Sequence, residues 1–432
     1  MRARQLSPRQ LVARPSVLGP LVLVMFGTFA AASPARTVVH SADAGLRGAL
    51  DRQLAPAGPR AGAFVYDATS RHILYARGAD RLLTPASNEK IYTTGSALLR
   101  FGGAARLRTA VLAVAATGPD GSLPGDLYLR GQGDPTFGSA AYVADAYGTG
   151  STVEELARDL AGAGVRSVQG SVVGDESFFD RLRGTPADNY AKSFFLEGQL
   201  SGLAFNRGLS DSGGSFQASP ATWAADRLTS ALRKAGIRVA GRAREGPAPP
   251  SGRELGHVDS PTMSVLVRLT NRPSDNFFAE TLLKDLGARF GAGGTTAAGA
   301  GVVRATLASH GVRPQRIVDG SGLSYADRTS PRQVGGFLTA LRATAARTPF
   351  DQSLAVAGRN GTLAGRMNGT AAAGRCRGKT GTLPGVSALS GYCTSRRGHT
   401  LVFSILMNGV NVSAARGRQD RMAIALARYS GS

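Results

Sequence analysis

The chain has 432 residues, of which 42% are hydrophobic and 19% are charged. This composition is typical of a folded globular protein and excludes an intrinsically disordered chain. The length predicts two or three domains. Fifty-seven glycines and 21 prolines indicate many turns and loops, so a mixed α/β architecture fits the sequence better than a helical bundle.

The formal net charge is +22, and a charge of this size first suggests a nucleic-acid partner. Lysine occurs only five times, however, so nearly all of the positive charge is arginine, and the arginines are spread along the chain without a Lys/Arg-rich run. We therefore expect no nucleic-acid binding. Association with an anionic cell wall or membrane surface is the more plausible reading of the charge.

The N-terminus has the features of an export signal. Four arginines within the first 14 residues precede an apolar run from Val17 to Ala32, and small residues follow it. We predict a signal peptide over residues 1–35 and an exported, extracytoplasmic protein. The alternative is an uncleaved anchor, but glycine and proline interrupt the run, which is short for a membrane span of about 20 residues.

The first predicted elements are a hairpin and a helix. Apolar, aromatic-bearing runs at 62–67 and 72–76 flank a short turn, which indicates a β-hairpin. The stretch from Ser87 to Phe101 is amphipathic, with Pro85 before it and two glycines after it. Proline near the start and glycine beyond the end predict a helix.

The middle of the chain has a different sequence pattern from both ends. From 106 to 257, short strand-like runs alternate with Gly/Asp turns, and a Pro/Gly-rich linker closes the region. We expect a β-rich insert there, with room for two subdomains. The remaining predicted elements are helices at 263–270, 276–290 and 414–429 and strands at 378–382, 388–393 and 400–407. Residues 37–105 and 258–432 together predict one domain in which helices pack on an antiparallel sheet.

The sequence argues against the commonest hydrolase sites. Its five histidines form no His-Glu-x-x-His pair, so a zinc protease of that type is not expected, and no Gly-x-Ser-x-Gly elbow is present. The sequence does not exclude a Ser-His-Asp triad, although no histidine lies in a motif typical of one. A lysine-assisted serine is the remaining option.

One tetrad has the spacing that such a serine needs. Ser87-Asn88-Glu89-Lys90 is the only Ser-x-x-Lys in the chain and opens the predicted helix. A spacing of three on a helix puts both side chains on one face. A serine hydroxyl is a weak nucleophile until a base removes its proton, and a partly desolvated lysine near other positive charge can be neutral enough to do so. Ser87 could otherwise be an ordinary helix N-cap.

Two further motifs strengthen this interpretation. Ser274-Asp275-Asn276 opens a predicted helix, and Lys379-Thr380-Gly381-Thr382 lies on a predicted strand. The three motifs in this order are the signature of penicillin-binding proteins and class A β-lactamases.

More narrowly, the chain resembles the S13-type D-alanyl-D-alanine carboxypeptidases, a branch of the low-molecular-mass penicillin-binding proteins, over about residues 50–430. The stretches that carry the resemblance are 85–90, 131–136, 173–175, 271–276, 319–324 and 378–382. Ser274 follows Ser87 by 187 positions, a separation that compact β-lactamases lack. Members of this branch are similar in carrying inserted domains there. The resemblance implies a penicillin-binding, β-lactamase-like fold of the α/β (α+β) class, an antiparallel sheet flanked by helices.

The resemblance also implies a role for each motif residue. Ser87 would attack the D-Ala-D-Ala carbonyl and form an acyl-enzyme, with Lys90 as its general base. Ser274 would relay a proton to the leaving amine, and Asn276 would hydrogen-bond the substrate amide and Lys90.

The third motif would bind the substrate's terminal carboxylate. Lys379 would supply positive charge there, and Thr380, Gly381 and Thr382 would line the binding site. The backbone N–H groups of Ser87 and Thr382 would form the oxyanion hole. No metal or cofactor is required.

These roles predict a serine-type carboxypeptidase that acts on peptidoglycan stem peptides, with endopeptidase action on cross-links as an extension. β-Lactam antibiotics would be its inhibitors. One alternative is a β-lactamase, which would share all three motifs but must release its acyl group fast. Another is a catalytically idle cell-wall-binding protein that keeps the fold.

The two cysteines predict a single disulfide. Cys376 and Cys393 are the only ones in the chain, and an isolated pair in an oxidising compartment usually joins. Two thiols alone cannot complete a four-ligand zinc site. A hairpin turning near Pro384 and Gly385 would place them opposite each other, where a disulfide would brace the strand that carries Lys379.

Overall fold

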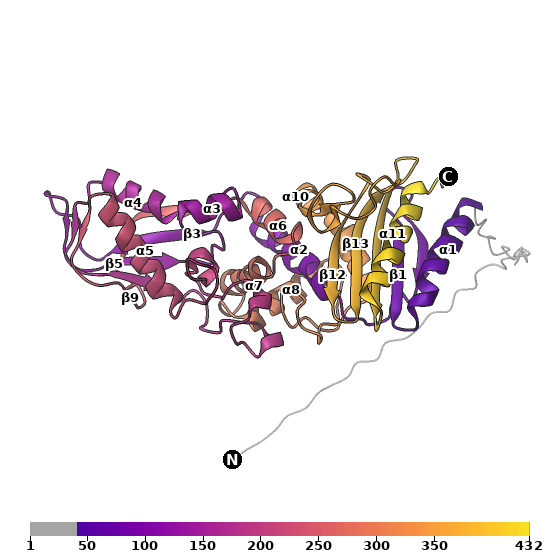
Figure 1. Ribbon diagram of the computed structural model, residues 1–432, viewed down its shortest axis with the longest axis horizontal. Helices are drawn as coiled ribbons and strands as arrows, with labels where there is room; N and C mark the ends of the chain where they lie inside the picture. Colours follow the sequence, from indigo (N-terminus) through magenta and orange to yellow (C-terminus); the bar gives the residue numbers. More distant parts are fainter. Residues whose placement is uncertain (1–40, 432) are drawn as a thin grey trace, which may run out of the picture. The chain divides into compact units, whose positions relative to one another are not determined.

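The computed structural model describes residues 41–431 (Figure 1). The predicted signal peptide lies outside these residues. Within 41–431, no helix combines the length and the apolar character that crossing a bilayer requires.

The two ends of the chain share one six-stranded antiparallel sheet, with strand order β11-β12-β13-β14-β1-β2. Its strands are β1 (Ala61–Asp67), β2 (His72–Arg77), β11 (Ala355–Val356), β12 (Cys376–Leu383), β13 (Val386–Thr394) and β14 (Thr400–Asn408). The predicted hairpin and the three predicted C-terminal strands are confirmed, each with small differences at its ends. Because β1 pairs with β14, the N-terminal part of the described chain is built into the same sheet as the C-terminal part.

Helices cover both faces of this sheet (Figure 1). On one face lie α1 (Ser41–Leu54) and α11 (Val412–Arg428), and α9 (Pro331–Leu341) packs on the other. Residues 401–407 of β14 are all buried, and six of these seven are apolar. A strand covered on both faces is expected to carry such a near-continuous apolar run.

The remaining helices of this part of the molecule form a layer beside the sheet. They are α2 (Glu89–Phe101), α6 (Met263–Asn271), α7 (Asn276–Phe290), α8 (Thr296–Ser309) and α10 (Arg347–Ser353). The helices predicted at 263–270 and 276–290 are confirmed as α6 and α7. The helix predicted from Ser87 begins with a 3₁₀ turn, Ala86–Asn88, and continues as α2.

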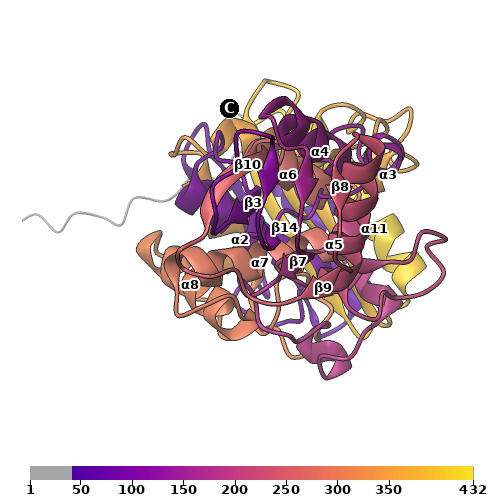
Figure 2. The ribbon, with the colours of Figure 1, turned by 90° about the vertical axis from the view of Figure 1, so that its left-hand side faces the viewer.

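Residues 106–259, which cover the region predicted as an insert and are called the inserted region below, contain two further sheets. One has the order β10-β3-β5-β7-β9 and the other β4-β6-β8. Their strands are β3 (Arg108–Ala113), β4 (Ser122–Leu123), β5 (Leu127–Gly131), β6 (Ser167–Val168), β7 (Val172–Asp175), β8 (Arg238–Val239), β9 (Arg244–Glu245) and β10 (Arg253–Asp259). In Figure 2, β10, β3, β7 and β9 stand in front, with α5 beside them.

Three helices accompany these strands: α3 (Ala140–Ala146), α4 (Val153–Gly162) and α5 (Pro220–Lys234). The sequence indicated the strands but not the helices. Strands β5, β7 and β9 pair in parallel, and parallel neighbours need crossover connections, which here contain α4 and α5. The described residues form one compact unit, so the division into a peptidase domain and an insert at 106–257 stays a prediction.

The predicted disulfide is present. Cys376 on β12 and Cys393 on β13 are directly paired in the strand register and joined by a disulfide. Pro384 and Gly385 form the turn between the two strands. The disulfide therefore joins the strand that carries Lys379 to its neighbour, as the sequence predicted. Short 3₁₀ turns complete the fold at Ala55–Ala57, Pro186–Asp188, Phe194–Leu196, Phe205–Gly208 and Gly361–Leu363.

Candidate active site

Ser87 lies in a tight turn at the start of α2. The residue before it, Ala86, has a left-handed φ of 48°, a conformation that costs energy in a non-glycine residue and that clusters at functional sites. Gly322, with φ 79°, packs against this turn, and a Cβ at position 322 would overlap the Ala86 carbonyl oxygen. The Ser87 turn is thus held in place by a second segment that only glycine fits.

Lys90 lies one helical turn beyond Ser87 and is fully buried. Its ammonium donates hydrogen bonds to the Ser87 hydroxyl at 3.1 Å, to the Asn276 amide oxygen at 2.6 Å and to the Ser321 carbonyl at 2.7 Å. Burial lowers the pKa of Lys90 to about 8, against the opposing effect of nearby carboxylates, of which Glu280 is the strongest. The first two motifs therefore meet at one ammonium group.

The second motif lies at the start of α7. Ser274 has a left-handed φ of 75°. Asp275 caps the helix by accepting a hydrogen bond from the Phe278 N–H at 2.9 Å. Asp275 also accepts two hydrogen bonds from the Arg207 guanidinium, at 2.7 and 3.0 Å. A bidentate Arg–carboxylate pair of this kind is among the strongest and most directional contacts in proteins.

The inserted region also holds Asn276. The Asn276 side-chain amide donates to the Phe195 carbonyl at 2.8 Å, and its backbone N–H donates to the Glu197 carboxylate at 3.0 Å. Together with Arg207, these contacts fix the start of α7 from the side of the insert. Phe195, Glu197 and Arg207 were not predicted as part of the site, because their contacts arise only from the folded arrangement.

Lys379 reaches the second motif from strand β12. Its fully buried ammonium donates to the Ser274 hydroxyl at 2.7 Å and to the Thr380 carbonyl at 2.9 Å. Burial and the nearby positive charge of Lys90 hold the pKa of Lys379 well below its usual range. The Asn88 side chain donates to the Lys379 carbonyl at 2.8 Å, which ties β12 to the Ser87 turn.

The rest of the third motif follows the same strand. Thr380 donates to the Thr362 hydroxyl at 2.9 Å. A Cβ at Gly381 would lie 2.7 Å from the Pro85 carbonyl oxygen, so the strand backbone passes very close to the turn that carries Ser87. Thr382 is exposed, and its hydroxyl accepts a hydrogen bond from Arg416 at 3.0 Å.

A groove with a volume of about 940 Å³ opens beside these residues. Its lining includes Asn276 from the second motif, Thr382 from the third, and the apolar or aromatic side chains of Phe195, Leu323 and Tyr325. This volume is within the range of small-molecule and peptide sites. The structure therefore brings all five predicted catalytic residues to one place with a groove next to them.

Glu280 and Ser321 also belong to the site, although neither was predicted. Glu280 is buried on α7, one turn after Asn276, and its carboxylate accepts hydrogen bonds from the N–H groups of Gly320 and Ser321 at 2.9 and 2.7 Å. Burial raises the pKa of Glu280 to about 7. These bonds aim the Ser321 carbonyl at Lys90. The only sequence signal was the spacing of four between Asn276 and Glu280 on one helix face.

The segment 319–322 is a turn, as its Asp-Gly-Ser-Gly sequence indicates. Asp319 accepts hydrogen bonds from the N–H groups of Gly322 and Ser324, at 2.7 and 2.8 Å. It is also more than a turn, because Ser321 contacts Lys90 and Gly322 packs on Ala86. A turn sequence by itself does not indicate this position beside Ser87 and Lys90.

Comparison with known proteins agrees with this geometry. The model of the D-Ala-D-Ala carboxypeptidase 3 (S13) family matches residues 46–194 and 206–429. A D-alanyl-D-alanine carboxypeptidase from Actinomadura sp. (strain R39) is 30% identical, over 87% of this chain and 82% of its own. Carboxypeptidase DacB from Mycolicibacterium smegmatis is also 30% identical, over 80% of this chain and 75% of its own.

Solved structures show the same fold. Penicillin binding protein 4 (dacB) from Haemophilus influenzae superimposes with a TM-score of 0.72 at 19% identity, over 87% of this chain and 97% of its own. A complex of that protein with a β-lactam superimposes with a TM-score of 0.70 at 19% identity, over 89% and 99% of the two chains. The chain therefore belongs to the D-Ala-D-Ala carboxypeptidase 3 (S13) family.

Proposed function

We propose that this protein is a serine-type D-alanyl-D-alanine carboxypeptidase that acts on peptidoglycan stem peptides. The observation that carries the proposal is the contact between Lys90 and Ser87, 3.1 Å from nitrogen to oxygen, at a lysine whose pKa burial lowers to about 8. Such a lysine can accept the serine proton near neutral pH. The Actinomadura and Mycolicibacterium relatives, both named as carboxypeptidases, support the reaction class.

In the proposed acylation, the Ser87 oxygen attacks the carbonyl carbon of the penultimate D-alanine while Lys90 takes the hydroxyl proton. The backbone N–H groups of Ser87 and Thr382 would stabilise the negative oxygen of the tetrahedral intermediate. The close approach of β12 to the Ser87 turn at Gly381 supports this oxyanion hole.

Breakdown of the intermediate cleaves the bond between carbon and nitrogen. Ser274, which is hydrogen-bonded to Lys379, would relay a proton to the leaving amine of the terminal D-alanine, and the proton that Lys90 took from Ser87 would replace the one that leaves with the amine. The carboxylate of that residue would lie near Lys379, Thr380 and Thr382, where it would raise the pKa of Lys379 and favour its charged form. Water would then hydrolyse the acyl-enzyme and regenerate Ser87.

The wider setting follows from the same proposal. The predicted signal peptide at 1–35 would export the protein to the compartment that holds peptidoglycan. β-Lactams would acylate Ser87 as substrate mimics, which the β-lactam complex of the Haemophilus influenzae protein supports. The proposal has three extensions. They are endopeptidase action on cross-links, the division of the chain into a peptidase domain and an insert, and attraction to an anionic cell wall or membrane surface.

The test is direct. The purified protein is incubated with a peptide that ends in D-Ala-D-Ala, and free D-alanine is measured alongside the variant Ser87→Ala. The wild type should release one D-alanine per peptide, and the variant should release none while keeping the same thermal unfolding midpoint. Release by Ser87→Ala at the wild-type rate, or none by the folded wild type, would overturn the proposal. Fast turnover of penicillin would favour a β-lactamase instead.

A further inference from the structure

Arg416 contacts Thr382, the third-motif residue that lines the groove. It lies in α11, and its guanidinium donates to the Thr382 hydroxyl at 3.0 Å. Both Thr382 and Val412, the first residue of α11, line the groove. A helical side chain leans toward the N-terminus of its helix, so Arg416 extends toward the groove and not toward the far end of α11.

The positive charge of Arg416 has no acidic partner within the described residues. No carboxylate there lies within ion-pair distance of its guanidinium, whereas nearby Arg366 is paired with Asp420 at 2.7 Å. From position 355 to the end, the chain has eleven Lys and Arg residues but only one acidic residue, Asp420. An anion that neutralises Arg416 would have to come from outside this part of the chain.

We propose that Arg416 is a specificity-determining residue that binds the free carboxylate of the substrate's terminal D-alanine. This inference rests on the proposed carboxypeptidase function. A guanidinium has five N–H donors in a planar fork that matches a carboxylate. Thr382 takes one of these donors and orients the group, so the others remain for a ligand in the groove.

A second cation at this end of the groove has a clear physical use. Lys379 is fully buried, and burial holds its pKa well below its usual range, so its charge depends on pH and on the ligand. Arg416 is exposed, and an arginine stays protonated at all physiological pH values. Arg416 therefore supplies the permanent positive charge that attracts and orients a carboxylate before Lys379 is fully charged.

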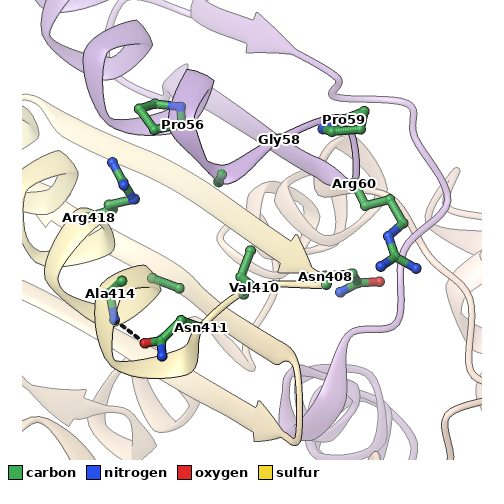
Figure 3. A pocket seen from close by; sticks show the side chains of 12 residues that line it. Pro56, Gly58, Pro59, Arg60, Asn408, Val410, Asn411, Ala414 and Arg418 are labelled. Atoms are coloured by element: carbon green, nitrogen blue, oxygen red, sulfur yellow. Dashed lines mark hydrogen bonds between the residues drawn. The ribbon is translucent and has the colours of Figure 1, made fainter.

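Arg418 provides a matched control on the same helix. It lies two residues further along α11 and lines a different pocket, of about 500 Å³, between the start of α11 and the segment Pro56–Arg60 (Figure 3). The same view shows Asn411 capping α11 through its hydrogen bond to the Ala414 N–H, at 3.0 Å. Replacing Arg418 removes the same charge from the same helix without touching Thr382 or the groove.

The experiment compares two peptides that differ only at the C-terminus, one ending in D-Ala-D-Ala and the other in D-Ala-D-alaninamide. Values of kcat and KM are measured for the wild type and for Arg416→Gln, Arg416→Lys and Arg418→Gln. Charge-assisted hydrogen bonds are worth enough that Arg416→Gln should lower kcat/KM for the acid about tenfold, mainly through KM. The wild type and Arg416→Gln should hydrolyse the amide with equal kcat/KM. Arg416→Lys should recover part of the loss of kcat/KM on the acid, and Arg418→Gln should match the wild type on both peptides.

Two results would overturn the inference while leaving the proposed function intact. One is an unchanged kcat/KM for the acid in Arg416→Gln. The other is an equal loss on the acid and the amide, since that would assign Arg416 a purely structural role on Thr382. A folded wild type that cleaves neither peptide would instead contradict the proposed function, and with it the ligand assigned to Arg416.

Discussion

Lys90 and Asn276 belong to helices far apart in the sequence, and the Lys90 ammonium donates a hydrogen bond of 2.6 Å to the Asn276 amide oxygen. The same Asn276 amide donates to the carbonyl of Phe195 in the inserted region. The proposed general base is therefore positioned by α2, by α7 and, through Asn276, by the insert.

The rate of acylation should depend on pH through Lys90. Burial lowers the pKa of Lys90 to about 8, and only the neutral amine can accept the Ser87 proton. Below pH 8 the neutral fraction falls about tenfold per pH unit, so the second-order rate of penicillin acylation should rise with pH and level off above 8. Stopped-flow measurements from pH 5.5 to 10 test this, and a flat profile across pH 6 to 9 would contradict it.

Glu280→Gln should move this profile to lower pH. The Glu280 carboxylate is the neighbour that most opposes the lowering of the Lys90 pKa, and its removal leaves the ammonium less stabilised. The amide oxygen of glutamine can still accept hydrogen bonds from the N–H groups of Gly320 and Ser321, so the position of the Ser321 carbonyl should not change. The exposed Glu254→Gln is the control and should leave the midpoint unchanged. A midpoint that does not move in Glu280→Gln would argue against this electrostatic role.

Asp275→Ala should destabilise the protein and slow acylation together. The change removes the cap of α7 and the bidentate partner of the buried Arg207 guanidinium, which keeps only the longer ion pair with Glu197 at 3.6 Å. Breaking a buried pair typically costs about 3–5 kcal/mol. Denaturant unfolding measures the loss. Arg244→Gln breaks an exposed ion pair with Asp126, which should cost at most about 1 kcal/mol. Equal losses of unfolding free energy in the two variants would show that the buried Arg207–Asp275 pair contributes no more to stability than an exposed ion pair.

Removing the disulfide should affect stability more than chemistry. Cys376 and Cys393 are 17 residues apart, and closing a loop of this size is worth about 3 kcal/mol in the chain-entropy model. The double variant Cys376→Ala/Cys393→Ala should lose roughly that free energy of unfolding and still be acylated by penicillin. A thiol assay on the unreduced wild type should find no free cysteine. Complete loss of acylation in a folded double variant would mean that the disulfide itself holds Lys379 in place.

The sequence predicted the parts of the fold that carry strong local patterns. Strands β13 and β14 have apolar runs bounded by turn residues. Strand β12 carries the Lys379-Thr380-Gly381 motif, and α7 begins at an Asp cap that is followed by apolar side chains at helical spacing. Helix α8, in contrast, is rich in Ala, Gly and Thr, so its helical period is weak and the helix forms because α7 and its neighbours bury it. The helices of the insert were missed because parallel pairing, which requires them, is a long-range property.

The same distinction holds for the site. Ser87, Ser274 and Lys379 were predicted because each belongs to a short motif with fixed spacing. Glu280 accepts a hydrogen bond from the N–H group of Ser321, and Arg207 donates to Asp275. The partners in each contact are distant in sequence and meet only in the folded protein. A single sequence contains no local sign of such contacts, since each residue type is common and stands in an ordinary context.

The central claim is that Ser87 is the nucleophile, and the most direct measurement is mass spectrometry of the protein after incubation with benzylpenicillin. Peptide mapping should find one penicilloyl group, on the peptide that contains Ser87, and the intact adduct should persist for much longer than the acylation takes. The variant Ser87→Ala, folded to the same unfolding midpoint, should show no added mass. An adduct on another residue, or an adduct of equal yield in Ser87→Ala, would contradict the account.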